Sequence, residues 1–240
     1  MPTDPELMQM HVEALFVHNA DGDIVRVNEP TGARAPHFFL GGFANGKILR
    51  FRDDVNAAIR QQLTAVAARE DTAEWPCTPI DATPYQAVLL RHGPIANTST
   101  GPAFCFSAPS SRDEDLHRLP HNMQTTPMNA NNARLLHPLL AEWLGDTTLC
   151  EPMIALVVDE QAVSLCCSVR RTALAHEAGI ETAAAHCGHG YGSRVAQSWA
   201  QAVHEMNRVA LYSTSWNNTL SRAVARKLGL HHFGSDLHIS

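Results

Sequence analysis

Three glycines stand at alternate positions, Gly188, Gly190 and Gly192, where a predicted strand leads into a predicted helix. Glycine lets the backbone approach a ligand closely because it has no Cβ, and the N–H groups at a helix start attract an anion. The pattern therefore predicts a site for a phosphate or a pyrophosphate. The competing interpretation is that the glycines only close a tight corner between a strand and a helix.

Two common nucleotide-binding patterns do not fit this turn. A dinucleotide-binding turn needs a third glycine where Ser193 stands, and an acidic residue at the end of the next strand, which residues 211–215 lack. A phosphate-loop NTPase needs Gly-Lys-Ser or Gly-Lys-Thr, which is absent from the chain. The sequence therefore disfavours the first class and excludes the second.

The predicted strand before the turn carries three candidate proton acceptors, His176, Glu177 and Glu181. A glutamate acts as a general base when apolar surroundings or a like charge raise its pKa toward neutrality. Strand alternation places His176 and Glu177 on opposite faces unless Gly179 introduces a bulge. The choice among the three stays open at this stage, and so does the interpretation that they are solvated residues in cross-strand pairs.

The N-terminal part of the chain predicts a smaller α+β domain. Two hairpins are expected, with a helix after them that is capped by Asp53 or Asp54 and runs to about Arg69. The predicted strand pairs are residues 12–17 with 24–27, and 38–40 with 48–51. A polar stretch over residues 108–120 then holds nothing able to fill a core, so we expect domains at 1–118 and 119–240.

The C-terminal part predicts a mixed α/β domain. A pair of helices begins near Asn129, and Pro138 either kinks the first or starts the second. Three consecutive antiparallel strands lead to the glycine turn, which is followed by a helix, a strand, a helix capped by Asn217 or Asn218, and a last strand. The predicted strands are residues 153–158, 162–169, 176–183, 209–214 and 230–239.

Two motifs in this domain match a known family. The segment Cys187-Gly-His-Gly190-Tyr-Gly192 matches its pyrophosphate loop, and Asn218, Ser221 and Lys227-Leu-Gly229 match a motif on the later helix. With this order of elements, residues 120–240 resemble the GNAT superfamily of acetyl-CoA-dependent N-acetyltransferases, in a two-domain bacterial form. The resemblance implies a twisted mixed sheet flanked by helices.

The resemblance also implies a reaction. An acetyl group would pass from acetyl-CoA, the cosubstrate, to a primary amine of a small molecule or peptide by direct attack, with Glu177, Glu181 or His176 taking the proton. Backbone N–H groups near residues 182–184 would polarise the thioester carbonyl. The implied coenzyme contacts are Thr182, Ala183, Ala184, Cys187, Gly188, His189, Gly190, Tyr191, Gly192, Ser193 and Asn218.

Two positions depart from the family pattern. Cys187 stands where the loop usually has arginine or glutamine, and Ala225 stands where many relatives have the tyrosine that protonates the leaving thiolate. Tyr212 replaces that acid only if its hydroxyl points toward the thiolate. Hence two alternatives stay open: a catalytically silent module that binds coenzyme A or a protein partner, and acyl transfer to a hydroxyl group.

Histidines near the turn suggest two further interpretations. His186, Cys187 and His189 lie too close together in the sequence, and lack a paired motif, for a zinc site, so we expect no metal. A protonated His186 or His189 beside the pyrophosphate would instead make coenzyme affinity rise as the pH falls toward 6.

Composition limits the classes of partner. Of 240 residues 45% are hydrophobic and 18% charged, the formal charge is −6, and no dense basic run is present, so we expect a globular protein without a nucleic-acid partner. No apolar run approaches the ~20 residues of a membrane span, and the acidic first ten residues are unlike a signal peptide. We therefore expect a cytoplasmic protein with no membrane partner. Nothing indicates its oligomeric state. Residues 191–240 alone are basic on balance, which suits an anionic ligand.

Overall fold

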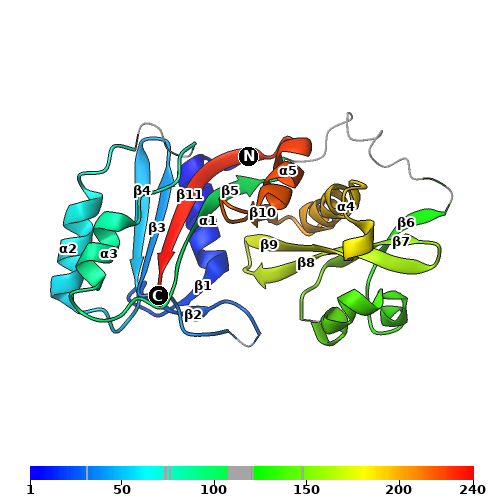
Figure 1. Cartoon of the computed structure of the whole chain (residues 1–240), viewed down its shortest axis with the longest axis horizontal. Coiled ribbons are helices and arrows are strands. Elements are labelled where there is room, and N and C mark those ends of the chain that lie inside the picture. Colours follow the sequence, from blue (N-terminus) through cyan, green and yellow to red (C-terminus); the bar gives the residue numbers. More distant parts are fainter. Residues whose placement is uncertain (31, 73–74, 76, 108–119, 121, 147–148) are drawn as a thin grey trace. The chain divides into compact units, whose positions relative to one another are not determined.

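The computed structural model describes residues 1–30, 32–72, 75, 77–107, 120, 122–146 and 149–240 (Figure 1). These residues form two compact units that the chain enters more than once. The first unit comprises residues 2–105, 213–219 and 231–240, and the second comprises residues 106–212 and 220–230. The predicted boundary after residue 118 falls within 108–119, outside the described residues.

The first unit is an antiparallel sheet between helices, with strand order β4-β3-β11-β5, and a separate β1-β2 hairpin. Its elements are α1 (Asp4–Leu15), β1 (Phe16–His18), β2 (Ile24–Val27), β3 (Phe38–Phe43), β4 (Gly46–Phe51), α2 (Ala57–Ala67), α3 (Thr83–Leu89), β5 (Thr98–Cys105) and β11 (His231–Ile239). Both predicted hairpins are confirmed, whereas α1, α3 and β5 were not predicted. The final strand, β11, pairs with β3 and β5 rather than with the strands that precede it in the sequence.

The prediction of a strand over residues 12–17 is wrong for residues 12–15, which continue helix α1. Glu6 starts this helix by accepting hydrogen bonds from the backbone N–H and the hydroxyl of Thr3, both at 2.8 Å. This capping box satisfies donors that the first turn leaves without partners. The predicted cap of α2 is also wrong, because Asn56 rather than Asp53 or Asp54 accepts the N–H of Ile59, at 3.0 Å.

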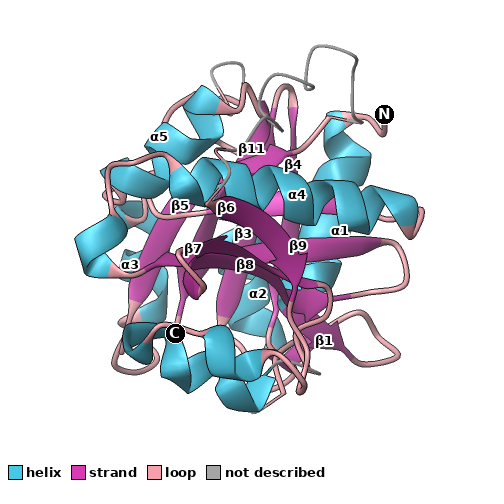
Figure 2. Ribbon diagram, turned by 90° about the vertical axis from the view of Figure 1, so that its right-hand side faces the viewer, coloured by secondary structure: helices cyan, strands magenta, loops and turns pink. Residues whose placement is uncertain are grey.

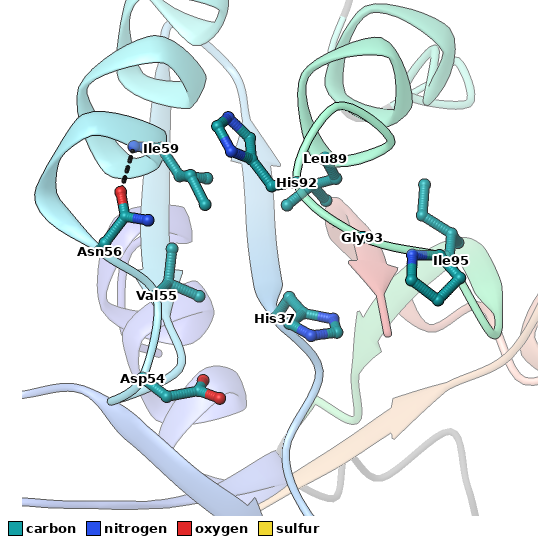
Figure 3. A pocket seen from close by; sticks show the side chains of 10 residues that line it. His37, Asp54, Val55, Asn56, Ile59, Leu89, His92, Gly93 and Ile95 are labelled. Atoms are coloured by element: carbon teal, nitrogen blue, oxygen red, sulfur yellow. Dashed lines mark hydrogen bonds between the residues drawn. The ribbon is translucent and has the colours of Figure 1, made fainter.

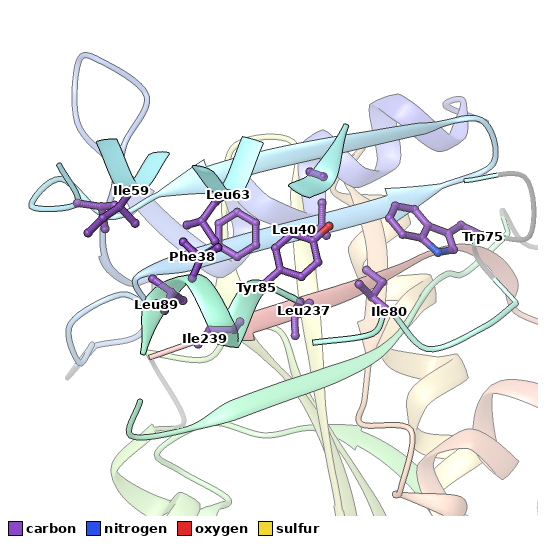
Figure 4. Close-up of a cluster of buried hydrophobic side chains, with 13 residues drawn as sticks. Phe38, Leu40, Ile59, Leu63, Trp75, Ile80, Tyr85, Leu89, Leu237 and Ile239 are labelled. Carbon is purple, nitrogen blue, oxygen red and sulfur yellow. The ribbon is translucent and has the colours of Figure 1, made fainter. Parts of the chain in front are cut away.

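Helices α2 and α3 cover one face of the first sheet. Figure 4 shows the cluster they form with β3 and β11, in which Phe38, Leu63, Tyr85 and Leu237 are fully buried. The rings of Phe38 and Tyr85 stack with centroids 5.2 Å apart. Since the cluster also contains Leu237, it joins residues from opposite ends of the sequence in one core.

Helix α1 covers the other face and is attached to β11 by two histidine–aspartate pairs. His11 Nε2 lies 2.8 Å from Asp236 Oδ2, and His231 Nε2 lies 2.7 Å from Asp4 Oδ1. A second imidazole, of His238, lies 3.4 Å from Asp236. Burial by itself would raise the pKa of Asp236, but the charges and hydrogen bonds of His238 and His11 hold it well below its usual range.

The second unit is a mixed sheet with strand order β10-β9-β8-β7-β6, in which only the β9–β10 pair is parallel. Its elements, two of which extend by a residue into the first unit, are β6 (Met123–Pro127), η2 (Ala133–Leu135), η3 (Pro138–Asp146), β7 (Met153–Val158), β8 (Gln161–Arg171), β9 (Ala175–Thr182), η4 (Ala184–His186), α4 (Tyr191–Glu205), β10 (Val209–Ser213) and α5 (Thr219–Lys227). The predicted mixed α+β class and the three antiparallel strands are confirmed. β6 was not predicted.

The two faces of this sheet are covered differently. Helix α4 lies across the strands (Figure 2) and buries Val195, Trp199 and Val203, at the predicted helical spacing. The opposite face is covered by η2 and η3, which are 3-10 segments where an α-helical pair was predicted; Pro138 starts the second of them. Across the described ranges, no helix has the length and apolar character needed to cross a bilayer.

Candidate functional site

The glycine turn has the backbone shape of an anion site. Gly188 and Gly190 have φ angles of +81° and +78°, in the left-handed region that side chains disfavour, and Gly190 is the residue immediately before α4. The first N–H groups of α4 have no acceptor within the helix, and left-handed residues in such a turn direct successive amides toward one point. Gly192 differs, because a Cβ there would make ordinary contacts, the nearest at 3.5 Å from Ile180. Two of the three glycines are therefore required by the backbone.

Aromatic rings gather beside this turn. His189 stacks on Tyr191 with ring centroids 5.4 Å apart, and His186 lies 6.3 Å from the same tyrosine. His189 Nδ1 is 3.0 Å from the carbonyl oxygen of Cys187, so this nitrogen carries the hydrogen of that bond. The exposed ring of His189 therefore lies at the rim of the turn, held by Tyr191 and by the carbonyl of Cys187.

Strand β9, which leads to the turn, pairs with β10 along only part of its length. The β9–β10 ladder ends at the pair Glu177 and Leu211, whereas β9 stays paired with β8 as far as Thr182. The N–H of Ala183 donates to Val163 on the β8 side at 2.9 Å. Because peptide groups alternate along a strand, the N–H of Thr182 points away from β8, toward the edge where the ladder has ended. Backbone N–H groups of residues 182–184 were expected to polarise the thioester. Of these, the N–H of Thr182 points toward this edge, whereas the N–H of Ala183 is bonded to Val163.

The three candidate bases lie on two faces of β9. The bulge in this region is at Val169 on β8, not at Gly179, so alternation along β9 is regular. His176 faces α4 and is 4% exposed, with Nδ1 2.9 Å from Ser168 Oγ, which also accepts from Trp199 at 3.1 Å. Burial, with the charges of Arg171 and Arg208, lowers the pKa of His176 to about 4. His176 is therefore a neutral, buried part of the core at neutral pH.

The two glutamates face η2 and η3 instead. Glu177 is 1% exposed and stands directly across the ladder from Arg170. Glu181 is only partly buried and accepts a hydrogen bond from Trp143 Nε1 on η3, at 2.9 Å. Glu181 is also the residue immediately before Thr182, whose N–H points to the free edge of β9. The structure thus brings one accessible carboxylate next to one oriented backbone donor.

Tyr212 lies against α5, near the position of the missing acid. Its hydroxyl donates to the carbonyl of Ser221, at 3.4 Å, one helical turn before Ala225. Burial raises the pKa of Tyr212 to about 12. Asn218, whose N–H donates to Ser215 at 3.0 Å, belongs to the first unit, whereas the glycine turn belongs to the second.

Sequence reasoning did not find Trp143 as a partner of Glu181, since nothing in the local pattern of η3 points to β9. Within the described residues, no group of three or more histidine, cysteine, aspartate or glutamate side chains is placed to hold a metal ion.

The comparisons with known proteins agree with this topology. No family model and no curated protein sequence matches the chain. Among solved structures, a GCN5-related N-acetyltransferase-like protein from Streptococcus suis is 14% identical and superposes with a TM-score of 0.52 over 98% of this chain and 99% of that one. The chain adopts the GNAT fold.

Two further solved structures are similar to parts of this chain. A protein from Novosphingobium aromaticivorans assigned to the GNAT family is 11% identical (TM-score 0.46), and a GCN5-related N-acetyltransferase from Sphaerobacter thermophilus is 13% identical (TM-score 0.47). The matches cover 61% and 68% of this chain, and 66% and 58% of those proteins, which is less than two thirds of their length.

The first unit contains a separate pocket of about 290 Å³ (Figure 3). Its apolar floor includes Ile59 and Leu89, and its rim includes His37 and His92. The carboxylate of Asp54 at this pocket is already paired with Arg34 and Arg52, and Asn56 is engaged in capping α2. These two polar groups at the pocket are therefore occupied by contacts within the first unit.

Proposed function

We propose that this protein is an N-acetyltransferase that moves an acetyl group from acetyl-CoA to a primary amine of a small molecule or peptide. The observation that carries the proposal is that β9 separates from β10 after Glu177, in the strand that leads into the glycine turn. Acetyl-CoA carries a pyrophosphate at a distance from its thioester. One strand edge with a backbone donor, leading into an anion-binding turn, offers a complementary site to each group.

Three groups in this chain bind the pyrophosphate, polarise the thioester and accept the proton. The N–H groups of residues 188–193 bind the pyrophosphate at the start of α4. The N–H of Thr182 donates to the thioester carbonyl and stabilises the negative charge that develops there. Glu181 accepts the proton of the attacking amine, directly or through a water molecule, as the new C–N bond forms and the C–S bond breaks. Acetyl-CoA, when bound, supplies the acetyl group in activated form.

A catalytically silent module that binds coenzyme A remains the alternative function. Two observations favour it. The Sγ of Cys187 contacts the carbonyl oxygens of Thr182 and Ala183, at 3.7 and 3.8 Å. The side chain of Ala225 cannot protonate a leaving thiolate. Turnover with any amine separates the two functions, because both require coenzyme binding and only one requires release of the thiol.

The first test is thermal unfolding of the full chain with and without acetyl-CoA. A ligand present at one hundred times its dissociation constant adds about 2.7 kcal/mol of stability. We expect a saturable shift that Gly190→Asp abolishes, since a carboxylate there repels the pyrophosphate. Gly192→Ala is the matched control and should keep the shift, because a Cβ fits at that position.

Two results would count against the proposal. Wild-type protein that is folded, free of copurified coenzyme and unshifted by acetyl-CoA does not have this cofactor site. A clear shift with no thiol released across a panel of amines supports the silent module instead.

A further inference from the structure

Lys227, the last residue of α5, places its ammonium group against the glycine turn. A Cβ built on Gly190 would collide with Nζ of Lys227, so the lysine reaches the residue that precedes α4. Both residues belong to the second unit. Lys227 is exposed, and within the described part of the chain no carboxylate is paired with it.

This position is electrostatically unfavourable for a lysine in the absence of an anion. The N-terminus of a helix carries a partial positive charge, so a cation there is repelled. No acidic residue in the first turn of α4 offsets the charge of Lys227. An anion bound between the ammonium group and the first N–H groups of α4 is attracted by both, and it offsets the repulsion between them.

The side chain at position 187 cannot supply that charge. Cys187 is uncharged in its thiol form, and its Sγ lies against the carbonyls at the end of β9. Lys227 approaches the same turn from α5, forty positions later in the sequence. Lys227 therefore brings a positive charge to the glycine turn, where position 187 carries an uncharged thiol.

We propose that Lys227 binds the pyrophosphate of coenzyme A in the glycine turn and replaces the missing side chain at Cys187. This inference rests on the proposed function. It assigns Lys227 to the pyrophosphate, and not to the phosphate on the ribose, because its Nζ lies at Gly190, the residue that precedes the first N–H groups of α4.

The test is calorimetric titration of the full chain with coenzyme A. Lys227→Gln should weaken binding about tenfold, the usual order for one charge-assisted hydrogen bond. Arg226→Gln is the matched control, since it removes the same charge from the neighbouring exposed residue, and it should weaken binding less than about twofold. Without coenzyme, Lys227→Gln should melt no lower than wild type, because it removes a repulsion; a structural role predicts a lower melting temperature.

Two coenzyme fragments identify which phosphate is bound. Dephospho-coenzyme A keeps the pyrophosphate, so Lys227→Gln should weaken it by the same factor. Pantetheine has no phosphate, so the variant and wild type should bind it equally. The double variant Cys187→Arg with Lys227→Gln should regain most of the lost affinity, because arginine restores a cation from within the loop.

Each contrary result has a distinct meaning. If Lys227→Gln binds coenzyme A as wild type does, the inference is wrong and the proposed function stands. If the loss disappears with dephospho-coenzyme A, Lys227 binds the ribose phosphate and the inference is again wrong. If wild type itself does not bind coenzyme A, both the inference and the proposed function are overturned.

Discussion

Histidines in the two units stand in opposite environments. In the first unit, His11 is fully buried and lies against the buried carboxylate of Asp236. In the second unit, His189 is exposed and stacks on Tyr191 beside the glycine turn. Removing one partner of a buried pair leaves the other group uncompensated in the core, whereas an exposed side chain can be replaced at little cost to the fold. Histidine is thus part of the core in one unit and lies at the surface beside a glycine turn in the other.

The largest expected effect comes from removing the buried carboxylate. Asp236→Asn leaves His11 and His238 without their counter-charge in the core, so we expect a loss of about 3–5 kcal/mol in the free energy of unfolding. Urea unfolding measures this loss. Asp4→Asn, which breaks the partly exposed pair with His231, should cost at most about 1 kcal/mol. Equal losses in the two variants would contradict the distinction between buried and exposed pairs.

A second effect concerns the pH dependence of stability. The folded pKa of His176 is about 4, below the ordinary histidine value of 6.5, so the unfolded chain binds the proton more readily. Stability from this residue is present above about pH 6.5 and is lost as the pH falls toward 4, by at most about 3 kcal/mol.

Unfolding experiments at pH 7 and pH 5 measure the effect of His176, and His176→Gln should reduce the difference between them. Asp236 adds a separate loss at lower pH. Its folded pKa is depressed, so its contribution is complete above about pH 4 and falls as the carboxyl protonates. An unchanged slope between pH 5 and 7 in His176→Gln would show that His176 is not the titrating group.

The third effect is on catalysis. Glu181→Gln should lower kcat about a hundredfold, because glutamine cannot accept the amine proton, while the affinity for acetyl-CoA stays nearly the same. Steady-state thiol release and calorimetry measure the two quantities. Glu177→Gln should affect the free energy of unfolding more than kcat, since Glu177 is buried opposite Arg170. If instead Glu177→Gln lowers kcat and Glu181→Gln lowers mainly the free energy of unfolding, the general base is Glu177.

The smallest expected effect is on coenzyme affinity. His189 stacks on Tyr191 at the exposed side of the turn, so His189→Gln should weaken the binding of acetyl-CoA by at most about threefold. Titration calorimetry measures this change. A loss as large as that expected for Lys227→Gln would contradict the assignment of the main cationic contact to Lys227.

The sequence predicted most of the second unit. The apolar, β-branched runs over residues 153–158 and 162–169, with a third strand at 176–183, predicted three strands within a few residues of their observed ends, and the apolar spacing of Val195, Trp199 and Val203 predicted α4. The first unit was predicted less well. Its α1 was missed although Thr3 and Glu6 form a recognisable capping box, because the apolar residues near its end also fit a short strand.

The sequence by itself determined the local features whose causes lie within a few residues: the glycine turn, the helix it starts and the alternation along β9. Tertiary structure alone decided the pairing of β11 with β3 and β5, the contact of Trp143 with Glu181, and the approach of Lys227 to Gly190. These contacts join residues far apart in the chain, and their formation depends on the packing of whole elements. For that reason the glycine turn could be predicted from the sequence, whereas the approach of Lys227 to it and the choice of Glu181 as the more accessible of the two glutamates could not.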